Sequence, residues 1–282
     1  MKKLIRSFTS ASRELFRRWG ALLIILVLYL VMLGATYWFF VTRETTVGQL
    51  VLSLLLALVA PLLFLVIQTM SARYNSGNQS AWGLLGGSLR DFWKLLVISL
   101  PLILVAILAI YLFGKIETTP AAAVKEAARA LPASPRPLVT KTQPISWQSV
   151  ALATFEYLLF LLVLPLAAIH LWIGAAREGL KNTFRRLHHL LARAFAPQSV
   201  VIYLIGFVVF AVIPYFLIVL KTPAGNAWLD VGLLLGRLLL AALFSLIGWV
   251  VTVGALANRN EGILSSQSSH SREGPDHVPA EA

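Results

Sequence analysis

The chain has 282 residues, of which 58% are hydrophobic and only 13% charged. A typical soluble domain carries about 25% charged residues, so this composition argues against a soluble globular protein. The net charge of +12 could suggest nucleic acid, but the basic residues cluster beside long apolar segments, and we expect no nucleic-acid partner. The absence of cysteine excludes disulfides and thiolate metal sites.

Six apolar segments with basic residues at their flanks organise the chain. A helix rises about 1.5 Å per residue, so crossing a hydrocarbon core of about 30 Å takes about 20 residues. All six segments reach that length, and runs such as LLIILVLYLVML do not alternate as barrel strands do. The sequence therefore predicts an all-α polytopic membrane bundle of six transmembrane helices, arranged as three hairpins. The expected helices are 19–42, 47–70, 95–114, 146–176, 199–220 and 228–257.

A short, basic, amphipathic segment precedes each hairpin. Apolar residues in each segment recur at spacings of three and four, which places them on one face of a helix. We expect these helices to lie in the membrane interface, with their cations toward anionic headgroups. Packing against other protein is the alternative. The apolar stripes are Leu4, Phe8, Ala11 and Leu15; Trp82, Leu85, Leu89 and Phe92; and Leu180, Phe184, Leu187 and Leu191. The arginines expected to contact lipid headgroups are Arg13, Arg17, Arg18, Arg185, Arg186 and Arg193.

The second helices of the first two hairpins share a sequence pattern. Pro61 and Pro165 are each followed 12 residues later by an Ala-Arg pair that ends at Arg73 or Arg177. The third hairpin keeps only a similar ending, Ala257-Asn258-Arg259, so a third copy stays open. Each copy runs in the same direction. Parallel repeats also occur in transporters, so the repeat does not decide the function.

Two segments outside the apolar runs are expected to differ in structure. Residues 115–145 form a long loop, in which 121–131 is predicted as a short helix after Pro120 and the proline-rich part is predicted to be extended. Residues 260–282 are rich in Ser, Gly, Pro and charge, which predicts a disordered tail. A single membrane domain then covers residues 1–259.

The distribution of Lys and Arg predicts the orientation. With the N-terminus inside, 16 basic residues lie on the cytoplasmic side and seven on the other. The positive-inside rule therefore favours cytoplasmic termini, which makes 260–282 a cytoplasmic tail and 115–145 a periplasmic loop.

The lead-in Arg13-Glu14-Leu15-Phe16-Arg17-Arg18-Trp19-Gly20, with looser echoes near Phe92 and Phe184, carries a family resemblance. It resembles a group of bacterial six-helix membrane proteins of unknown role, similar to the membrane domain of some glycerophosphodiester phosphodiesterases. The resemblance covers the helical layout and implies the bacterial inner membrane. No soluble phosphodiesterase domain accompanies it here, so no catalytic residues carry over.

Glu156 and Arg237 are charges within the apolar segments. Counting from Arg177 and Arg259 places them 21 and 22 positions away, at nearly the same depth and close to the outer boundary. We predict a structural ion pair or boundary anchor. A substrate or ion site is the alternative, because charges inside a membrane often mark function.

Three other patterns have ordinary structural explanations. His170 is alone on its helix, which favours a hydrogen-bonded packing role over a proton relay. His188 and His189 are adjacent and face different ways, whereas helical metal ligands are three or four residues apart. Gly232 and Gly236 form a GxxxG pattern, which either marks a packing face or arises by chance. We therefore expect no metal and no cofactor.

No metalloprotease, phosphate-loop or serine-hydrolase motif occurs, so we expect no enzyme. The leading prediction is a non-enzymatic structural or accessory component of the bacterial inner membrane, with anionic lipids as partners and a homo-oligomer left open. A small-solute transporter or channel is the alternative, and an intramembrane enzyme is the third. The helix cores hold few polar residues, which disfavours a wide aqueous pore.

Overall fold

The computed structural model describes residues 2–42, 46–74, 80–129, 147–220 and 227–270, and over these residues every regular element is a helix. Six helices are long and apolar enough to cross a membrane. The predicted fold class is therefore confirmed. The helices form three hairpins, and the two arms of each hairpin pack against each other.

The first hairpin follows the predicted boundaries closely. It comprises α1 (Lys2–Arg17), α2 (Trp19–Val41) and α3 (Val47–Arg73). A capping box starts α3, because Thr46 Oγ1 accepts from the Gln49 backbone N–H at 3.3 Å and Gln49 Oε1 accepts from the Thr46 N–H at 3.1 Å. Pro61 lies inside α3 without ending it.

The second hairpin corrects the predicted division of residues 81–131. One continuous helix, α4 (Ala81–Arg129), joins the expected interfacial segment, the span and most of the short helix that was expected at 121–131. The returning helix consists of α5 (Trp147–Leu158), the π-helical turn η1 (Leu159–Val163) and α6 (Leu164–Glu178). The predicted extended stretch at 132–144 lies outside the described residues.

The third hairpin begins with two short helices, α7 (Leu180–Arg185) and α8 (Leu187–Ala194). Then follow α9 (Pro197–Phe207), the π-helical turn η2 (Val208–Val212), α10 (Ile213–Val219) and α11 (Ala227–His270). Because α11 continues to His270, the predicted start of a disordered tail at residue 260 is wrong for 260–270. The rest of that tail lies outside the described residues.

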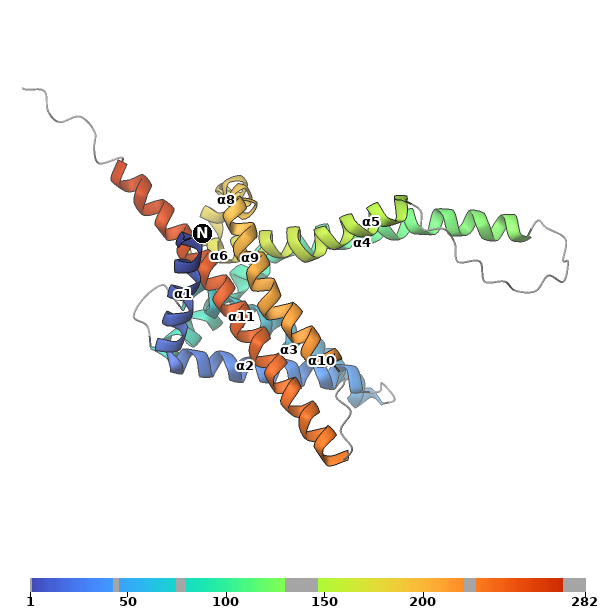
Figure 1. Cartoon of the computed structure of the whole chain (residues 1–282), viewed down its shortest axis with the longest axis horizontal. Helices are drawn as coiled ribbons and strands as arrows, with labels where there is room; N and C mark the ends of the chain where they lie inside the picture. The colour runs from blue at the N-terminus through green and yellow to red at the C-terminus, as the bar shows by residue number, and fades with distance from the viewer. Residues whose placement is uncertain (1, 43–45, 75–79, 130–146, 221–226, 271–282) are drawn as a thin grey trace, which may run out of the picture.

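The three hairpins meet at one end of the bundle and separate toward the other. Figure 1 shows the second hairpin (α4 and α5) and the third hairpin (α10 and α11) leaving the common centre in different directions. The second helices α3, α6 and α11 contact one another there, and α1 packs along α11. We call this meeting region, formed around residues 65–72 of α3, 166–176 of α6 and 250–257 of α11, the hub. The opposite ends of the hairpins are called the far ends.

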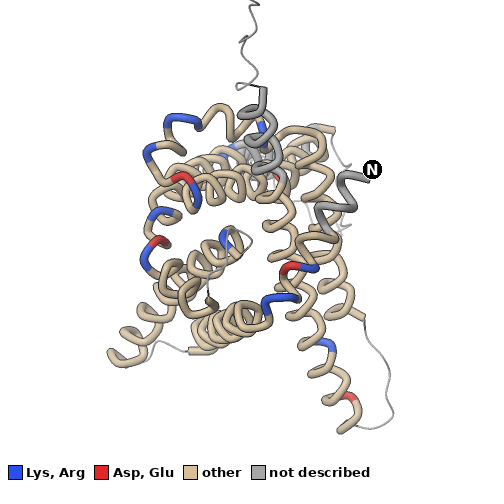
Figure 2. Tube along the Cα trace, turned by 90° about the vertical axis from the view of Figure 1, so that its left-hand side faces the viewer, with Lys and Arg blue, Asp and Glu red and all other residues tan. Residues whose placement is uncertain are grey.

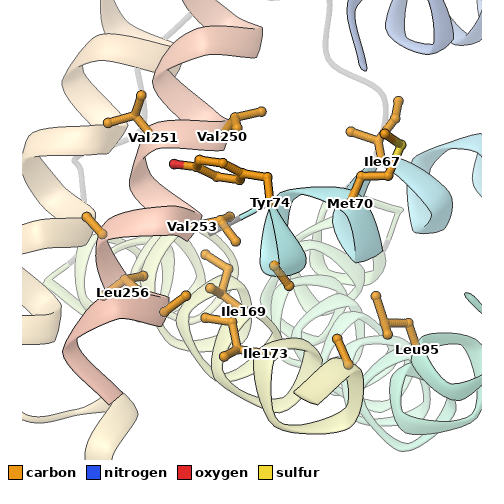
Figure 3. Packing of buried hydrophobic residues seen from close by; sticks show 14 of the residues in the cluster. Ile67, Met70, Tyr74, Leu95, Ile169, Ile173, Val250, Val251, Val253 and Leu256 are labelled. Atoms are coloured by element: carbon orange, nitrogen blue, oxygen red, sulfur yellow. The ribbon is translucent and has the colours of Figure 1, made fainter. Parts of the chain in front are cut away.

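The core lies in the hub. Residues 65–72 of α3 and 250–257 of α11 are all buried, as are most of residues 166–176 of α6. Figure 3 shows the Tyr74 ring lying against α11, between Val250 and Val253, with Ile169 and Ile173 of α6 nearby. Tyr74 fits there because Gly254 has no side chain: a Cβ at that position would overlap the tyrosine hydroxyl.

Both π-helical turns end two residues before a proline, at Pro165 and Pro214. Proline has no N–H, so it leaves the carbonyl four residues earlier without its helical partner. For Pro165 that carbonyl is Leu161, and it accepts a hydrogen bond from the Tyr203 hydroxyl of α9 at 2.8 Å. A neighbouring helix thus satisfies the freed backbone group, as an apolar environment requires.

Candidate functional site

Two arginines in the hub join the last turns of α3 and α6 to each other and to residue 257 within α11. Arg73 of α3 donates from Nε and Nη2 to the Ala176 carbonyl of α6, at 3.1 and 2.9 Å. Arg177 of α6 donates from Nη1 to the Ala257 carbonyl of α11 and from Nε to the Ala72 carbonyl of α3, both at 3.2 Å. Ala72 and Ala176 belong to the last turns of their helices, whose carbonyls have no partner within the helix. The arginine charges also suit these negative helix ends.

These contacts follow the sequence repeat. The arginine of the first copy bonds to the alanine of the second, and the arginine of the second bonds to the alanine of the third. In the third copy Asn258 occupies the position after Ala257, and Arg177 instead supplies the bond to Ala72. The repeated Ala-Arg pair therefore has a structural role: it joins successive hairpins.

Asp91 of α4 anchors the second hairpin to this junction. Its carboxylate oxygens lie 2.5 Å from Arg73 Nη2 and 2.7 Å from Lys94 Nζ, and its side chain is only 6% exposed. A buried carboxylate requires such partners, because its hydration has been lost. The Arg73 guanidinium therefore bridges Asp91 of α4 and Ala176 of α6.

A basic pocket opens beside the hub, where α6 turns into α7. Gly179 makes the turn with φ +80°, a conformation that suits glycine. The pocket has a volume of about 700 Å³ and is lined by Arg177, Glu178, Asn182, Arg185 and Arg186. Glu178 Oε2 lies 3.6 Å from Arg186 Nη1, a side chain that is largely exposed, so one carboxylate faces three guanidinium groups. The surplus positive charge suits a phosphate group.

The amphipathic segments have both an inward and an outward face. In α1, Ala11 and Leu15 of the predicted stripe are fully buried, and α1 packs on α11. The second and third stripes face away from the hub, as the interfacial placement expects and packing on protein does not, and their contact with lipid stays a prediction. The face of α4 that packs inward carries Leu84, Ser88, Asp91 and Leu95, and that of α7 and α8 carries Thr183, Leu190 and Ala194. The predicted apolar residues of those two segments stay half-buried or exposed.

The six arginines expected to contact headgroups are placed as follows. Arg13, Arg17, Arg185 and Arg186 are exposed, whereas Arg18 and Arg193 are partly buried. Arg17 and Arg18 both pair with Glu14, at 3.1 and 2.9 Å. Figure 2 shows that the charged residues are grouped and that long stretches of helix carry none. Their contact with lipid stays a prediction.

Glu156 and Arg237 do not form the predicted ion pair within the described part of the chain. Glu156 lies on α5, which packs beside α4, and Arg237 lies on α11, which packs beside α9, η2 and α10. The Arg237 Nη1 donates to the carbonyl of Leu220, at the end of its own hairpin. The two residues lie at similar distances along their helices, but on different hairpins. These hairpins separate toward the far ends, so the two charges do not meet (Figure 1).

The histidines have packing roles or lie side by side. His170 is buried, and its Nδ1 lies 3.0 Å from the Leu166 carbonyl, which fits the packing role. The His188 and His189 rings lie against each other, and no group of metal-ligating side chains occurs among the described residues.

The glycines of the GxxxG pattern, Gly232 and Gly236, face open space. Close helix contacts occur instead at other glycines, among them Gly206 and Gly248, between η2, α9 and α11, and Gly254 at Tyr74.

Sequence reasoning missed two features of the hub. Asp91, which lies between Arg90 and Lys94, was not singled out, although the structure turns it toward Arg73 of α3. Gln68 of α3 and Trp249 of α11 form a buried hydrogen bond of 2.7 Å between hairpins. A polar residue within an apolar span was the available signal for Gln68, but nothing in the sequence identified its partner.

These observations define a polytopic α-helical membrane protein with its core and its cationic junction at one end of the bundle. No family model, no curated protein and no solved structure matches the chain. The resemblance to bacterial six-helix membrane proteins stays a prediction.

Proposed function

We propose that the protein is a non-enzymatic structural or accessory component of the bacterial inner membrane, which binds anionic phospholipid headgroups through its basic hub. The observation that carries this proposal is the pocket of Arg177, Arg185 and Arg186 at the turn between α6 and α7. Guanidinium groups bind phosphate oxygens with charge-assisted hydrogen bonds, and they do so at the level where headgroups lie.

The surroundings of the pocket support a lipid partner. The partly exposed apolar residues Leu180, Phe184 and Leu187 lie on the same short helices as Arg185 and Arg186. An interfacial helix needs this combination, because its apolar side chains enter the acyl boundary while its cations meet the headgroups. The excess of Lys and Arg on the flanks that adjoin the hub favours a cytoplasmic hub.

The test compares binding of anionic and zwitterionic phospholipids with the same acyl chains to the purified full chain. Arg185→Gln together with Arg186→Gln should reduce the preference for the anionic lipid, since each charge near the surface contributes about 1 kcal/mol. Arg237→Gln, at a far end, is the matched control and should leave the preference unchanged. An unaltered preference in the double variant would contradict the proposal.

Orientation is tested separately by reporter fusions after residues 130 and 265. The proposal expects the two reporters on opposite sides of the membrane, with the second in the cytoplasm. Two reporters on the same side would contradict the six-span topology.

A further inference from the structure

A small cavity lies between the first and third hairpins, and it shares no lining residue with the basic pocket. Its volume is about 180 Å³, and its walls are mostly apolar, with Phe64 and Ile67 of α3 facing Phe210 of η2 and Leu246 of α11. Tyr29, Gln68 and Ser245 add polar groups to this lining. An apolar cavity with a few convergent polar groups is the usual form of a small-molecule site.

Gln68 presents an unused amide group to the cavity. Its side chain is 2% exposed, and its Oε1 accepts the hydrogen bond from Trp249 Nε1 at 2.7 Å. An indole nitrogen can only donate, so the oxygen of the Gln68 amide must face Trp249 and the NH₂ must face elsewhere. The hydrogen bonds of the described residues include none from Gln68 Nε2. This buried group therefore offers two N–H donors to the space beside it.

Two hydroxyls that line the same cavity are also available. In other helices of the protein, hydroxyls such as those of Thr69, Ser99 and Thr252 donate to the carbonyl four residues earlier. Neither Ser245 nor Tyr29 takes part in a hydrogen bond among the described residues. The cavity thus combines apolar walls with donors that lack acceptors, which calls for a ligand whose polar atom is an acceptor.

We propose that this cavity binds the ester carbonyl and adjoining methylenes of a membrane phospholipid, with Gln68 Nε2 donating to the carbonyl oxygen. Gln68 lies five residues from Arg73, which is about 7.5 Å of helix, so it sits at the depth where headgroups give way to acyl chains. An ester carbonyl is an acceptor without a donor of its own. A cavity of about 150 Å³ holds a benzene-sized group, so about 180 Å³ fits the carbonyl and a few methylenes while the rest of the lipid stays in the bilayer.

This inference is independent of the proposed function, because it concerns the acyl linkage and not the headgroup charge. The test uses the purified full chain and a pair of phosphatidylethanolamines with the same chains, one ester-linked and one ether-linked. Competition between them is measured by native mass spectrometry. The ester lipid should be preferred by about fivefold to tenfold, the effect of one net hydrogen bond. Equal binding of the two lipids would overturn the proposal without any variant.

Two substitutions separate recognition from structure. Gln68→Met removes the amide and should abolish the ester preference. Tyr203→Phe removes another hydrogen bond between hairpins, the one to the Leu161 carbonyl, and leaves the cavity lining unchanged, so it should keep the preference. If Gln68→Met kept the preference, or Tyr203→Phe lost it while folded, the amide would serve only to join the helices.

A third substitution tests the cavity itself. Ser245→Phe should fill the cavity and remove one bound lipid, while Leu239→Phe, on an exposed side of α11, should leave the bound lipid unchanged. An unchanged number of bound lipids in Ser245→Phe would mean that water fills the cavity, and the proposal would fail.

The variants also distinguish this proposal from the proposed function. The arginine variants of the basic pocket should retain the preference for the ester lipid, and Gln68→Met should retain the preference for the anionic lipid.

Discussion

The hub half and the far half of the same helix differ in burial although both are apolar. In α3, residues 65–72 are all buried, whereas Ser53 is the buried residue among 47–58. The same contrast separates the two halves of α11, where Leu234 and Leu235 are exposed and Leu256 is fully buried. Lipid and protein interior are equally apolar, so hydropathy cannot separate them. Small residues and hydrogen bonds between helices distinguish the hub.

The difference shows what holds the helices together. Within a bilayer, apolar burial gives little driving force for helix association, and close packing and hydrogen bonds take its place. The hub has both: close contacts at Gly206, Gly248 and Gly254, and hydrogen bonds from Arg73 and Arg177 to backbone carbonyls of other hairpins. At the far ends, Gly232 and Gly236 have no neighbour.

The largest effect is expected from overpacking the hub. Gly254→Leu should destabilise the protein by about 3 kcal/mol or more, because the new side chain would overlap the Tyr74 hydroxyl. Gly232→Leu, on the same helix at the far end, should change the stability by less than about 0.5 kcal/mol. Unfolding of both variants in detergent measures the contrast. Similar losses in the two variants would break the distinction between hub and far end.

The next largest effect is expected from Arg73→Gln. It leaves Asp91 with Lys94 as its remaining cation and leaves the Ala176 carbonyl without its donor. Losing one partner of a buried ion pair costs about 3–5 kcal/mol, and because Arg73 is partly exposed we expect about 2–3 kcal/mol. Arg17→Gln is the control, because its pair with Glu14 is on the surface and such pairs contribute about 0–1 kcal/mol. Equal losses would mean that Arg73 does not join the hairpins.

A smaller effect is expected at the contact between the second and third hairpins. Tyr203→Phe removes the donor to the Leu161 carbonyl and should cost about 1 kcal/mol. In a Pro165→Ala background the backbone N–H at position 165 is restored and can bond to Leu161, so the same substitution should cost less there. A double-mutant cycle from thermal unfolding measures this coupling. Strict additivity would show that Pro165 does not create the need for Tyr203.

The smallest effect concerns the far ends. Glu156→Gln and Arg237→Gln should each have a modest effect, and because the two residues lie on hairpins that separate, their effects should add to within about 0.5 kcal/mol. Unfolding of the two single variants and the double variant gives the coupling energy. Coupling above about 1 kcal/mol would mean that the far ends close upon each other in the membrane.

The sequence predicted the spans well and the helix ends less well. Length and hydropathy locate each span because the bilayer imposes a minimum number of apolar residues. The same signals could not show that α4 continues through Pro120 to Arg129, because a proline marks a boundary in most helices. They also did not identify the inward faces of the second and third amphipathic segments. In those segments Asp91 and Thr183 face the protein, and apolar residues face outward.

The candidate site was only partly predictable. Basic residues around α7 indicated a headgroup surface, and the repeated Ala-Arg ending indicated a common structural role. The carbonyl partners of Arg73 and Arg177 and the indole partner of Gln68 lie 80 to 181 residues away along the chain, and no local pattern identifies them. The Glu156–Arg237 prediction failed for the same reason: matched depth specifies one coordinate, while pairing also depends on the direction in which each hairpin leaves the hub.

The central claim is that the helices pack at the hub and face lipid at the far ends. A lipid that carries a photoactivatable diazirine in its acyl chain labels lipid-facing side chains of the unaltered protein in vesicles, and mass spectrometry of the fragments locates the labels. We expect labelling of α3 at residues 47–58 and protection of residues 65–72. Equal labelling of the two segments, or protection of both, would contradict the account.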